Sequence, residues 1–211
     1  MDRGQRWQSP ALGPFFLSPV IERDTTFSSG IGEGAFSRLI IILNKYFNKP
    51  DPLPVRKFGK TFERDVRKGD IRYTFNEETG KFMHAMRKIR VRNSHCVFPC
   101  THPYDIRFSV STEVPVECAT SAIEAISVEE KAMGRKKERR SYIFEWFRID
   151  LTKVTVSTQP KPSWEVEVEL QKLEKLKSLQ QEHPNNPAYS KIMADFYGVL
   201  VVIESWIGTI P

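Results

Sequence analysis

The segment Trp164-Glu165-Val166-Glu167-Val168-Glu169-Leu170 alternates carboxylate and apolar side chains. This period of two is that of a β-strand, so the three glutamates share one face, with neighbours about 6.6 to 6.8 Å apart, and the apolar side chains share the other. Taken alone, the pattern favours a sheet whose polar face meets water. An enclosed polar face needs cations nearby, because adjacent carboxylates repel one another.

A second segment, residues 144–152, supplies such cations. Its side chains Arg148, Asp150 and Thr152 share one face, and Phe147, Ile149 and Leu151 share the opposite one. Strands of this kind that close with their polar faces inward form a barrel with a hydrophilic lumen and an apolar exterior covered by helices. Such a lumen suits Mg²⁺ or Mn²⁺ held by carboxylates and a phosphate chain held by basic side chains. The charged and polar residues concerned are Arg135, Lys137, Arg139, Arg140, Arg148, Asp150 and Thr152.

The rest of the chain predicts an α+β fold that is mostly antiparallel β. From residue 58 to residue 170, short alternating segments are separated by turn residues, which indicates antiparallel strands. We predict a hairpin with strands over 70–75 and 82–91, and further strands over 104–112, 142–154 and 164–170. Helical spacing of apolar residues predicts helices over 35–47 and 170–182 and a second C-terminal helix beyond residue 189. Residues 1–30 are broken by prolines and are expected to be irregular.

Composition restricts the class of protein. The 211 residues carry a net charge of +6, which favours a polyanionic partner. The longest apolar runs, 39–43 and 199–203, are far shorter than a membrane-spanning helix requires. Three cysteines are too few for a disulfide framework, which fits a reducing compartment. We therefore expect an intracellular protein.

Four segments in order, 104–116, 135–142, 148–153 and 165–169, resemble motifs of the fungal-type metal-dependent RNA 5′-triphosphatases. These are the mRNA-capping enzyme beta subunits of the triphosphate tunnel metalloenzyme family. Residues 88–91 resemble a fifth motif, and the resemblance covers about residues 15–170.

The resemblance implies a single domain over residues 1–211 that contains an antiparallel, eight-stranded triphosphate tunnel with flanking helices, including C-terminal helices over 171–211. The family's first strand carries a Glu-x-Glu pair, and no such pair in a strand context precedes Phe15. We therefore allow for a barrel that lacks one or more strands and a metal site that is short of ligands.

The implied activity is removal of the γ-phosphate from the 5′-triphosphate end of nascent mRNA, the first step of cap formation, in the nucleus. By resemblance, Glu169 and Glu167 are metal ligands for Mg²⁺ or Mn²⁺, and Glu167 also orients the attacking water. The implied catalytic residues are Glu167, Arg139 and Lys137; those that bind phosphate are Arg90, Lys137, Arg139 and Arg148; and the supporting residues are Asp150, Thr152, Glu113 and Glu165.

The implied partners are the RNA 5′-triphosphate end and an mRNA guanylyltransferase, with a homodimer as a further expectation. The alternative is a catalytically incompetent subunit of the same fold that binds triphosphate ends or a capping partner. The group His95, Cys96, Cys100 and His102 does not have standard zinc-finger spacing and is more typical of a cysteine-containing loop. The run 136–140 suits either a nuclear-localisation patch or a solvated strand.

Overall fold

The computed structural model describes residues 30–47, 57–96, 104, 106–183 and 185–208. Apart from Gly30, the expected irregular segment 1–30 lies outside these described residues.

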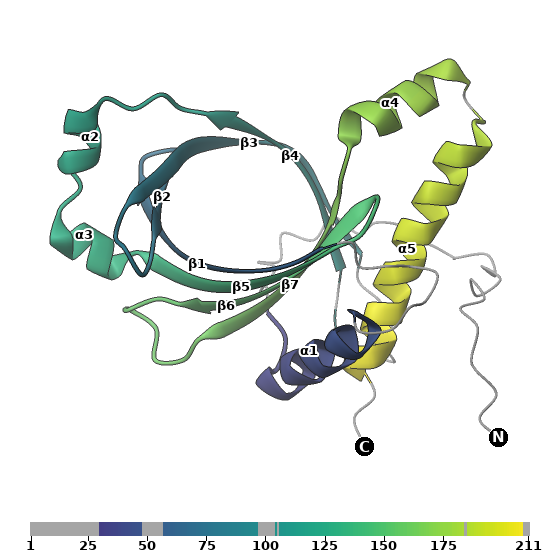
Figure 1. The fold of residues 1–211 in the computed structure, drawn as a ribbon, viewed down its shortest axis with the longest axis horizontal. Helices are drawn as coiled ribbons and strands as arrows, with labels where there is room; N and C mark the ends of the chain where they lie inside the picture. The colour runs from purple at the N-terminus through teal and green to yellow at the C-terminus, as the bar shows by residue number, and fades with distance from the viewer. Residues whose placement is uncertain (1–29, 48–56, 97–103, 105, 184, 209–211) are drawn as a thin grey trace.

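The described strands form one antiparallel sheet of seven strands in the order β4-β3-β2-β1-β5-β6-β7. The sheet curls strongly, so that one of its faces is concave, with β4 and β7 as its two edges (Figure 1). This confirms the predicted antiparallel α+β architecture, with one strand fewer than eight among the residues described. The strands are β1 Lys57–Lys68, β2 Ile71–Asn76, β3 Phe82–Cys96, β4 Ile106–Pro115, β5 Arg135–Ile143, β6 Phe147–Thr155 and β7 Ser163–Leu170.

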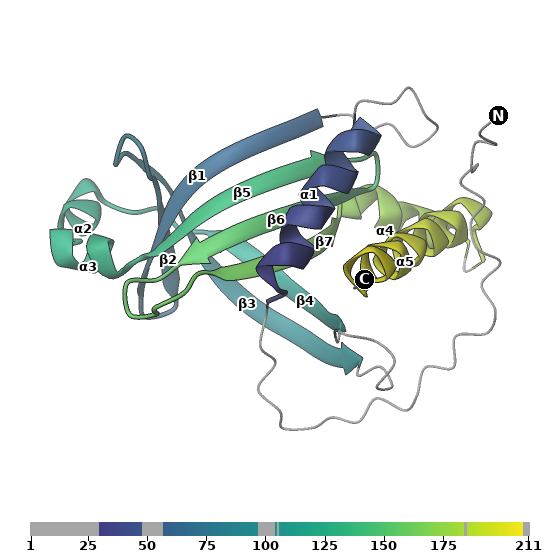
Figure 2. The same cartoon turned by 90° about the horizontal axis from the view of Figure 1, so that it is seen from below.

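In the part of the chain that the structure describes, five helices lie outside the curled sheet. In Figure 2, α1 crosses the outer side of β5, β6 and β7, with α5 beside it, whereas α2 and α3 lie at the other end of the molecule. Among the described residues, no helix is both long and apolar enough to cross a membrane. The helices are α1 Glu33–Phe47, α2 Thr120–Glu124, α3 Val128–Met133, α4 Leu173–Glu182 and α5 Pro187–Gly208.

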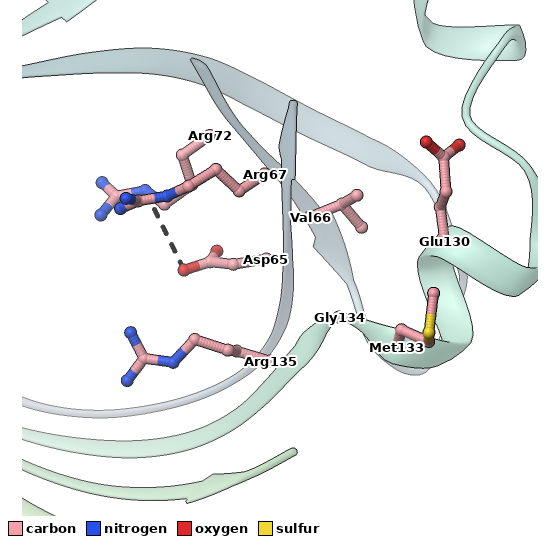
Figure 3. Close-up of a pocket in the computed structure, with 8 residues that line it drawn as sticks. All are labelled: Asp65, Val66, Arg67, Arg72, Glu130, Met133, Gly134 and Arg135. Carbon is pink, nitrogen blue, oxygen red and sulfur yellow. Dashed lines mark ion pairs between the residues drawn. The ribbon is translucent and has the colours of Figure 1, made fainter. Parts of the chain in front are cut away.

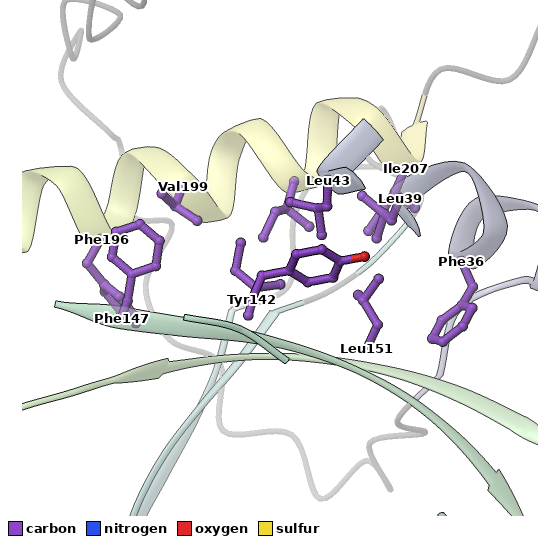
Figure 4. Close-up of a cluster of buried hydrophobic side chains, with 11 residues drawn as sticks. Phe36, Leu39, Leu43, Tyr142, Phe147, Leu151, Phe196, Val199 and Ile207 are labelled. Atoms are coloured by element: carbon purple, nitrogen blue, oxygen red, sulfur yellow. The ribbon is translucent and has the colours of Figure 1, made fainter. Parts of the chain in front are cut away.

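The main hydrophobic core lies between the convex face of the sheet and helices α1 and α5 (Figure 4). Tyr142 and Leu151 point outward from β5 and β6 and are completely buried beneath the helices. The Tyr142 hydroxyl donates a hydrogen bond to Asn44 Oδ1 of α1 at 2.8 Å, so this buried polar group has a partner. The predicted apolar exterior covered by helices is confirmed.

A smaller core lies beneath α2 and α3, where Ile126 packs with Val66, Tyr73 and Phe75. These two short helices are not among the elements predicted from the sequence. Helix α3 is started by a capping box in which the side chain of Ser127 accepts from the backbone N–H of Glu130 and the Glu130 carboxylate accepts from the backbone N–H of Ser127.

One predicted strand is wrong in its bounds. The segment 142–154 is divided by a turn in which Phe144 N–H donates to Phe147 C=O at 2.9 Å, so that β5 ends at Ile143 and β6 begins at Phe147. The basic run 136–140 lies within β5, as a strand that forms part of the sheet. Pairing with β1 on one side and β6 on the other places β5 in the interior of the sheet.

Candidate functional site

The polar residues of β5, β6 and β7 meet on the concave face of the sheet. Arg139 is opposite Thr152, which is opposite Glu165, and one step along the strands Asp150 is opposite Glu167. Arg148 is opposite Glu169 in the next step. Because side chains directly opposite one another lie on the same face, the predicted shared face of the three glutamates with Arg148 and Asp150 is confirmed.

Acidic and basic side chains alternate around this concave face from β4 to β7. Except between Lys137 and Arg139, each charge in this series pairs with the next one, of opposite sign, so most charges on this wall are neutralised within the protein. The pairs are Glu113 with Arg72 at 3.1 Å, Arg72 with Asp65 at 3.9 Å, Asp65 with Lys137, Arg139 with Asp150 at 3.7 Å, Asp150 with Arg148 at 3.1 Å, and Arg148 with Glu169.

The alternation is interrupted between Lys137 and Arg139. These two cations are next-but-one neighbours on β5, about 6.6 to 6.8 Å apart along the strand. No ion pair among the described residues links them, although Glu63 of β1 lies directly opposite Lys137 on the same face. Two adjacent cations repel each other and attract an anion placed between them. Phosphoryl oxygens suit this position, because guanidinium and ammonium groups bind them through charge-assisted hydrogen bonds.

Asp65 anchors Lys137 from the neighbouring strand. The Asp65 carboxylate is 7% exposed, pairs with Lys137 and accepts a hydrogen bond from the Thr74 hydroxyl at 2.9 Å. Burial alone raises the pKa of Asp65, but attraction to and hydrogen bonding with Lys137, with help from Thr74 and Arg72, outweighs it and holds that pKa below its ordinary value.

Asp65 and Arg72 are two residues of this wall that the sequence patterns did not single out. The available signal was the alternation in Asp65-Val66-Arg67 and Arg72-Tyr73-Thr74, which places charged side chains opposite apolar ones. That signal is weak, because β1 carries charged residues on both of its faces.

The wall formed by β5 and β6 contains buried polar atoms whose hydrogen bonds the described residues leave incomplete. They are Arg139 Nε, Arg148 Nε, Asp150 Oδ1 and Thr152 Oγ1. Asp150 and Thr152 are each only 2% exposed. Buried polar groups are normally hydrogen-bonded, so these four atoms distinguish this wall from an ordinary structural sheet surface.

The three glutamates of β7 have different surroundings. The Glu165 side chain is 15% exposed and pairs with Arg135 at 3.0 Å. The Glu169 side chain is 59% exposed and pairs with Arg148. Glu167 is exposed and forms no ion pair with any residue that the structure describes. Glu167 and Glu169 are therefore the accessible carboxylates of this strand.

These carboxylates fit a divalent cation only in part. Within the described ranges, no three His, Cys, Asp or Glu residues lie together as a metal-binding group. Mg²⁺, however, is commonly held by one or two carboxylates together with substrate phosphates and water. Glu167 and Glu169 fit that smaller protein contribution, which agrees with the expected shortage of ligands.

The remaining predicted residues lie apart from the β5–β6 wall. Glu113 of β4 pairs with Arg72 and also lies 3.9 Å from Lys88. Arg90 of β3 is exposed and forms no ion pair among the described residues, so the structure does not join it to Lys137, Arg139 and Arg148. Of the four residues considered as zinc ligands, Cys100 and His102 lie outside the described residues.

Comparison with known sequences identifies relatives. The sequence pattern of the family described as "mRNA capping enzyme, beta chain" matches residues 1–204. An mRNA-capping enzyme subunit beta of Yarrowia lipolytica is 30% identical over 156 residues, which are 71% of this chain and 36% of the relative. That of Schizosaccharomyces pombe is 26% identical over 164 residues, or 74% of this chain and 52% of the relative. The chain thus spans about a third to a half of the length of these curated relatives.

Solved structures show the same fold. The S. pombe Pct1 RNA triphosphatase superposes with a TM-score of 0.70 at 23% identity, over 85% of this chain and 70% of that one. The same triphosphatase in complex with the Spt5 CTD superposes with a TM-score of 0.72 at 24% identity, over 89% and 73% of the two chains.

Proposed function

Because the chain belongs to the family of mRNA capping enzyme beta chains, we propose that it is an RNA 5′-triphosphatase that removes the γ-phosphate from the 5′ end of nascent mRNA. The observation that carries the proposal is the interruption at Lys137 and Arg139 in an otherwise neutralised wall, beside the accessible carboxylates of β7.

The protein's own residues position the triphosphate. Lys137 and Arg139 hold phosphoryl oxygens, and Arg148 adds a third cation from β6. Asp150 lies between Arg139 and Arg148 and keeps both guanidinium groups directed along the wall. Fixed cations of this kind stabilise the negative charge that builds on the leaving phosphate oxygens, which is the main contribution a protein makes to phosphoryl transfer.

Glu167 and Glu169 would hold the divalent cation, Mg²⁺ or Mn²⁺, together with substrate oxygens. The cation, when bound, neutralises charge on the γ-phosphate. Glu167, which has no ion pair among the described residues, is the group best placed to accept a hydrogen bond from the attacking water and orient it.

The proposal includes a cellular setting and partners. We place the chain in the nucleus, where its substrate is nascent RNA, with an mRNA guanylyltransferase as its functional partner and a homodimer as its assembly. The basic net charge of +6 supports a polyanionic substrate. The Spt5 CTD in complex with the S. pombe triphosphatase makes a peptide of that kind a further partner to test.

The test is phosphate release from a 5′-triphosphate RNA in the presence of Mg²⁺ or Mn²⁺. Arg139→Ala is the informative variant, because Asp150 keeps Arg148 as a partner and is not left unpaired. We expect a loss of about 100-fold or more in rate, since misplacing the phosphate by about 1 Å has that effect. Lys177→Ala, an exposed lysine on α4, is the matched control. Unchanged release by Arg139→Ala would reject the proposed site.

A second candidate is a subunit of the same fold that binds triphosphate ends without hydrolysing them. It is favoured by the absence of a three-ligand metal group among the described residues. This candidate would be supported over the enzyme if triphosphate RNA binds in a manner that depends on Arg139 and no phosphate is released with either Mg²⁺ or Mn²⁺.

A further inference from the structure

We propose that Arg67 binds the sugar–phosphate backbone of the RNA that follows the triphosphate, and that this contact distinguishes an RNA end from a free triphosphate. The proposal rests on the proposed function, because it assumes that a triphosphate occupies the site at Lys137 and Arg139. It specifies where the RNA beyond the triphosphate binds. It also specifies the end of the curled sheet at which the RNA leaves the site.

Arg67 belongs to a group of three arginines, Arg67, Arg72 and Arg135, that we call the arginine end. Their side chains point to the concave side of the sheet with Asp65, whereas Val66, Glu130 and Met133 lie on the other side of β1 (Figure 3). The three arginines and Asp65 are among the residues that line a half-open hollow of about 520 Å³, whose lining also includes Val66, Glu130 and Met133.

Within the arginine end, Arg67 is the arginine whose charge no described residue neutralises. It lies directly opposite Arg72 in the pairing of β1 with β2, and like charges in that position destabilise a sheet. Arg72 is neutralised by Glu113 and Asp65, and Arg135 by Glu165. Arg67 is exposed and forms no ion pair or hydrogen bond with the part of the chain that the structure describes. An anionic ligand would relieve this repulsion.

The order of charges along β5 gives the direction of the RNA. The accessible carboxylates Glu167 and Glu169 lie level with residues 141 and 143 of β5. Arg139, Lys137 and Arg135 follow in steps of about 6.6 to 6.8 Å away from those carboxylates.

Arg135 is opposite Asp65, and Arg67 lies two residues further along β1. If the γ-phosphate is next to the carboxylates, the β- and α-phosphates follow Arg139 and Lys137. The first internucleotide phosphates then reach the arginine end. The opposite direction would bring phosphodiesters against Glu169, which repels them.

The experiment measures binding, so that it does not depend on hydrolysis. The probe is a short 3′-labelled RNA with a non-hydrolysable β,γ-imido 5′-triphosphate, followed by fluorescence anisotropy, and inorganic tripolyphosphate serves as the competitor. We expect Arg67→Glu to weaken RNA binding about tenfold, the range of one charge-assisted contact, while the inhibition constant of tripolyphosphate is unchanged. Arg67→Ala should reduce the slope of log affinity against log salt by about 0.7, the value for one phosphate contact on a single strand.

Controls separate this contact from a general effect. Lys177→Glu changes the same charge on α4 and should leave RNA binding unchanged, and Arg67→Lys should retain most of the affinity. Equal RNA affinity of Arg67→Glu and the unsubstituted chain would overturn the proposal. A parallel loss of affinity for RNA and for tripolyphosphate would also overturn it. If the protein releases no phosphate but Arg67→Glu selectively weakens RNA binding, the proposed hydrolase activity is rejected and the proposed RNA-binding site is retained.

Discussion

Lys137 and Arg139 are both cations of β5, but they have different structural roles. Lys137 pairs with a buried carboxylate, Asp65, and its side chain is only 10% exposed. Arg139 shares Asp150 with Arg148 and its side chain is 23% exposed. Removal of Lys137 therefore unpairs a buried charge, whereas removal of Arg139 does not. At the residue scale, activity and stability are coupled at Lys137 and are separable at Arg139.

The Asp65–Lys137 pair predicts an acid-dependent stability. The pKa of Asp65 is lowered in the folded protein, and that of an unfolded aspartate is about 3.9. The pair therefore contributes stability in full above about pH 4, and this contribution is lost as the pH falls through the lowered pKa. Denaturant unfolding between neutral and acidic pH should show that loss.

Asp65→Asn should destabilise the protein at neutral pH by about 3 to 5 kcal/mol, because it leaves Lys137 buried without its partner. The variant should also have a flatter stability profile below pH 4, since the titrating group is gone. Glu182→Gln, an exposed position on α4, is the control and should change neither quantity. An acid profile of Asp65→Asn identical to that of the unsubstituted chain would show that other carboxylates dominate.

At the scale of elements, the join between α3 and β5 determines where the basic strand begins. Gly134 separates Met133 from Arg135, and a Cβ atom there would lie 2.8 Å from the backbone oxygen of Asp65. That oxygen belongs to β1, so the contact cannot be relieved by rotation of a side chain. The close approach lets β5 start beside β1, with Arg135 opposite Asp65.

Gly134→Ala should destabilise the protein by about 1 to 3 kcal/mol, as overpacking of a close contact does. For a chain of this size, the expected decrease in melting temperature is about 2 to 4 °C for each kcal/mol. Gly34→Ala, in the first turn of α1 with nothing within 4 Å of its added Cβ, should be neutral or slightly stabilising. Equal melting temperatures for the two variants would contradict a close contact between Gly134 and the backbone of β1.

At the scale of the whole molecule, the curled sheet separates two environments. Its convex face is covered by α1 and α5 and supplies the hydrophobic core. Its concave face carries the ion pairs and the proposed phosphate site. The two carboxylates proposed for the metal are on β7, at one edge of the described sheet.

We expect phosphate release to require Mg²⁺ or Mn²⁺ and to be abolished by excess chelator, because the carboxylates themselves add negative charge to the triphosphate site. Glu167→Gln should weaken Mn²⁺ binding, measured by titration calorimetry, without changing the melting temperature, since Glu167 has no ion pair among the described residues. Undiminished release in chelator would remove the metal from the mechanism.

The sequence by itself determined which face each polar residue of β6 and β7 occupies. Alternation along a strand is a local property, since each residue turns the side chain to the opposite face whatever lies beside it. For that reason Glu165, Glu167 and Glu169 could be placed with Arg148 and Asp150, and the covered apolar exterior could be predicted with them.

Only the tertiary structure decided which charges become partners. Asp65 and Lys137 are far apart in the sequence and meet because β1 pairs with β5, so neither segment alone reveals the pair. The same applies to Arg72 with Glu113, and to Arg90, whose motif resembles the others but whose strand places it away from the β5–β6 wall. Strand pairing joins distant segments, and the alternation along one strand does not specify which distant strand lies beside it.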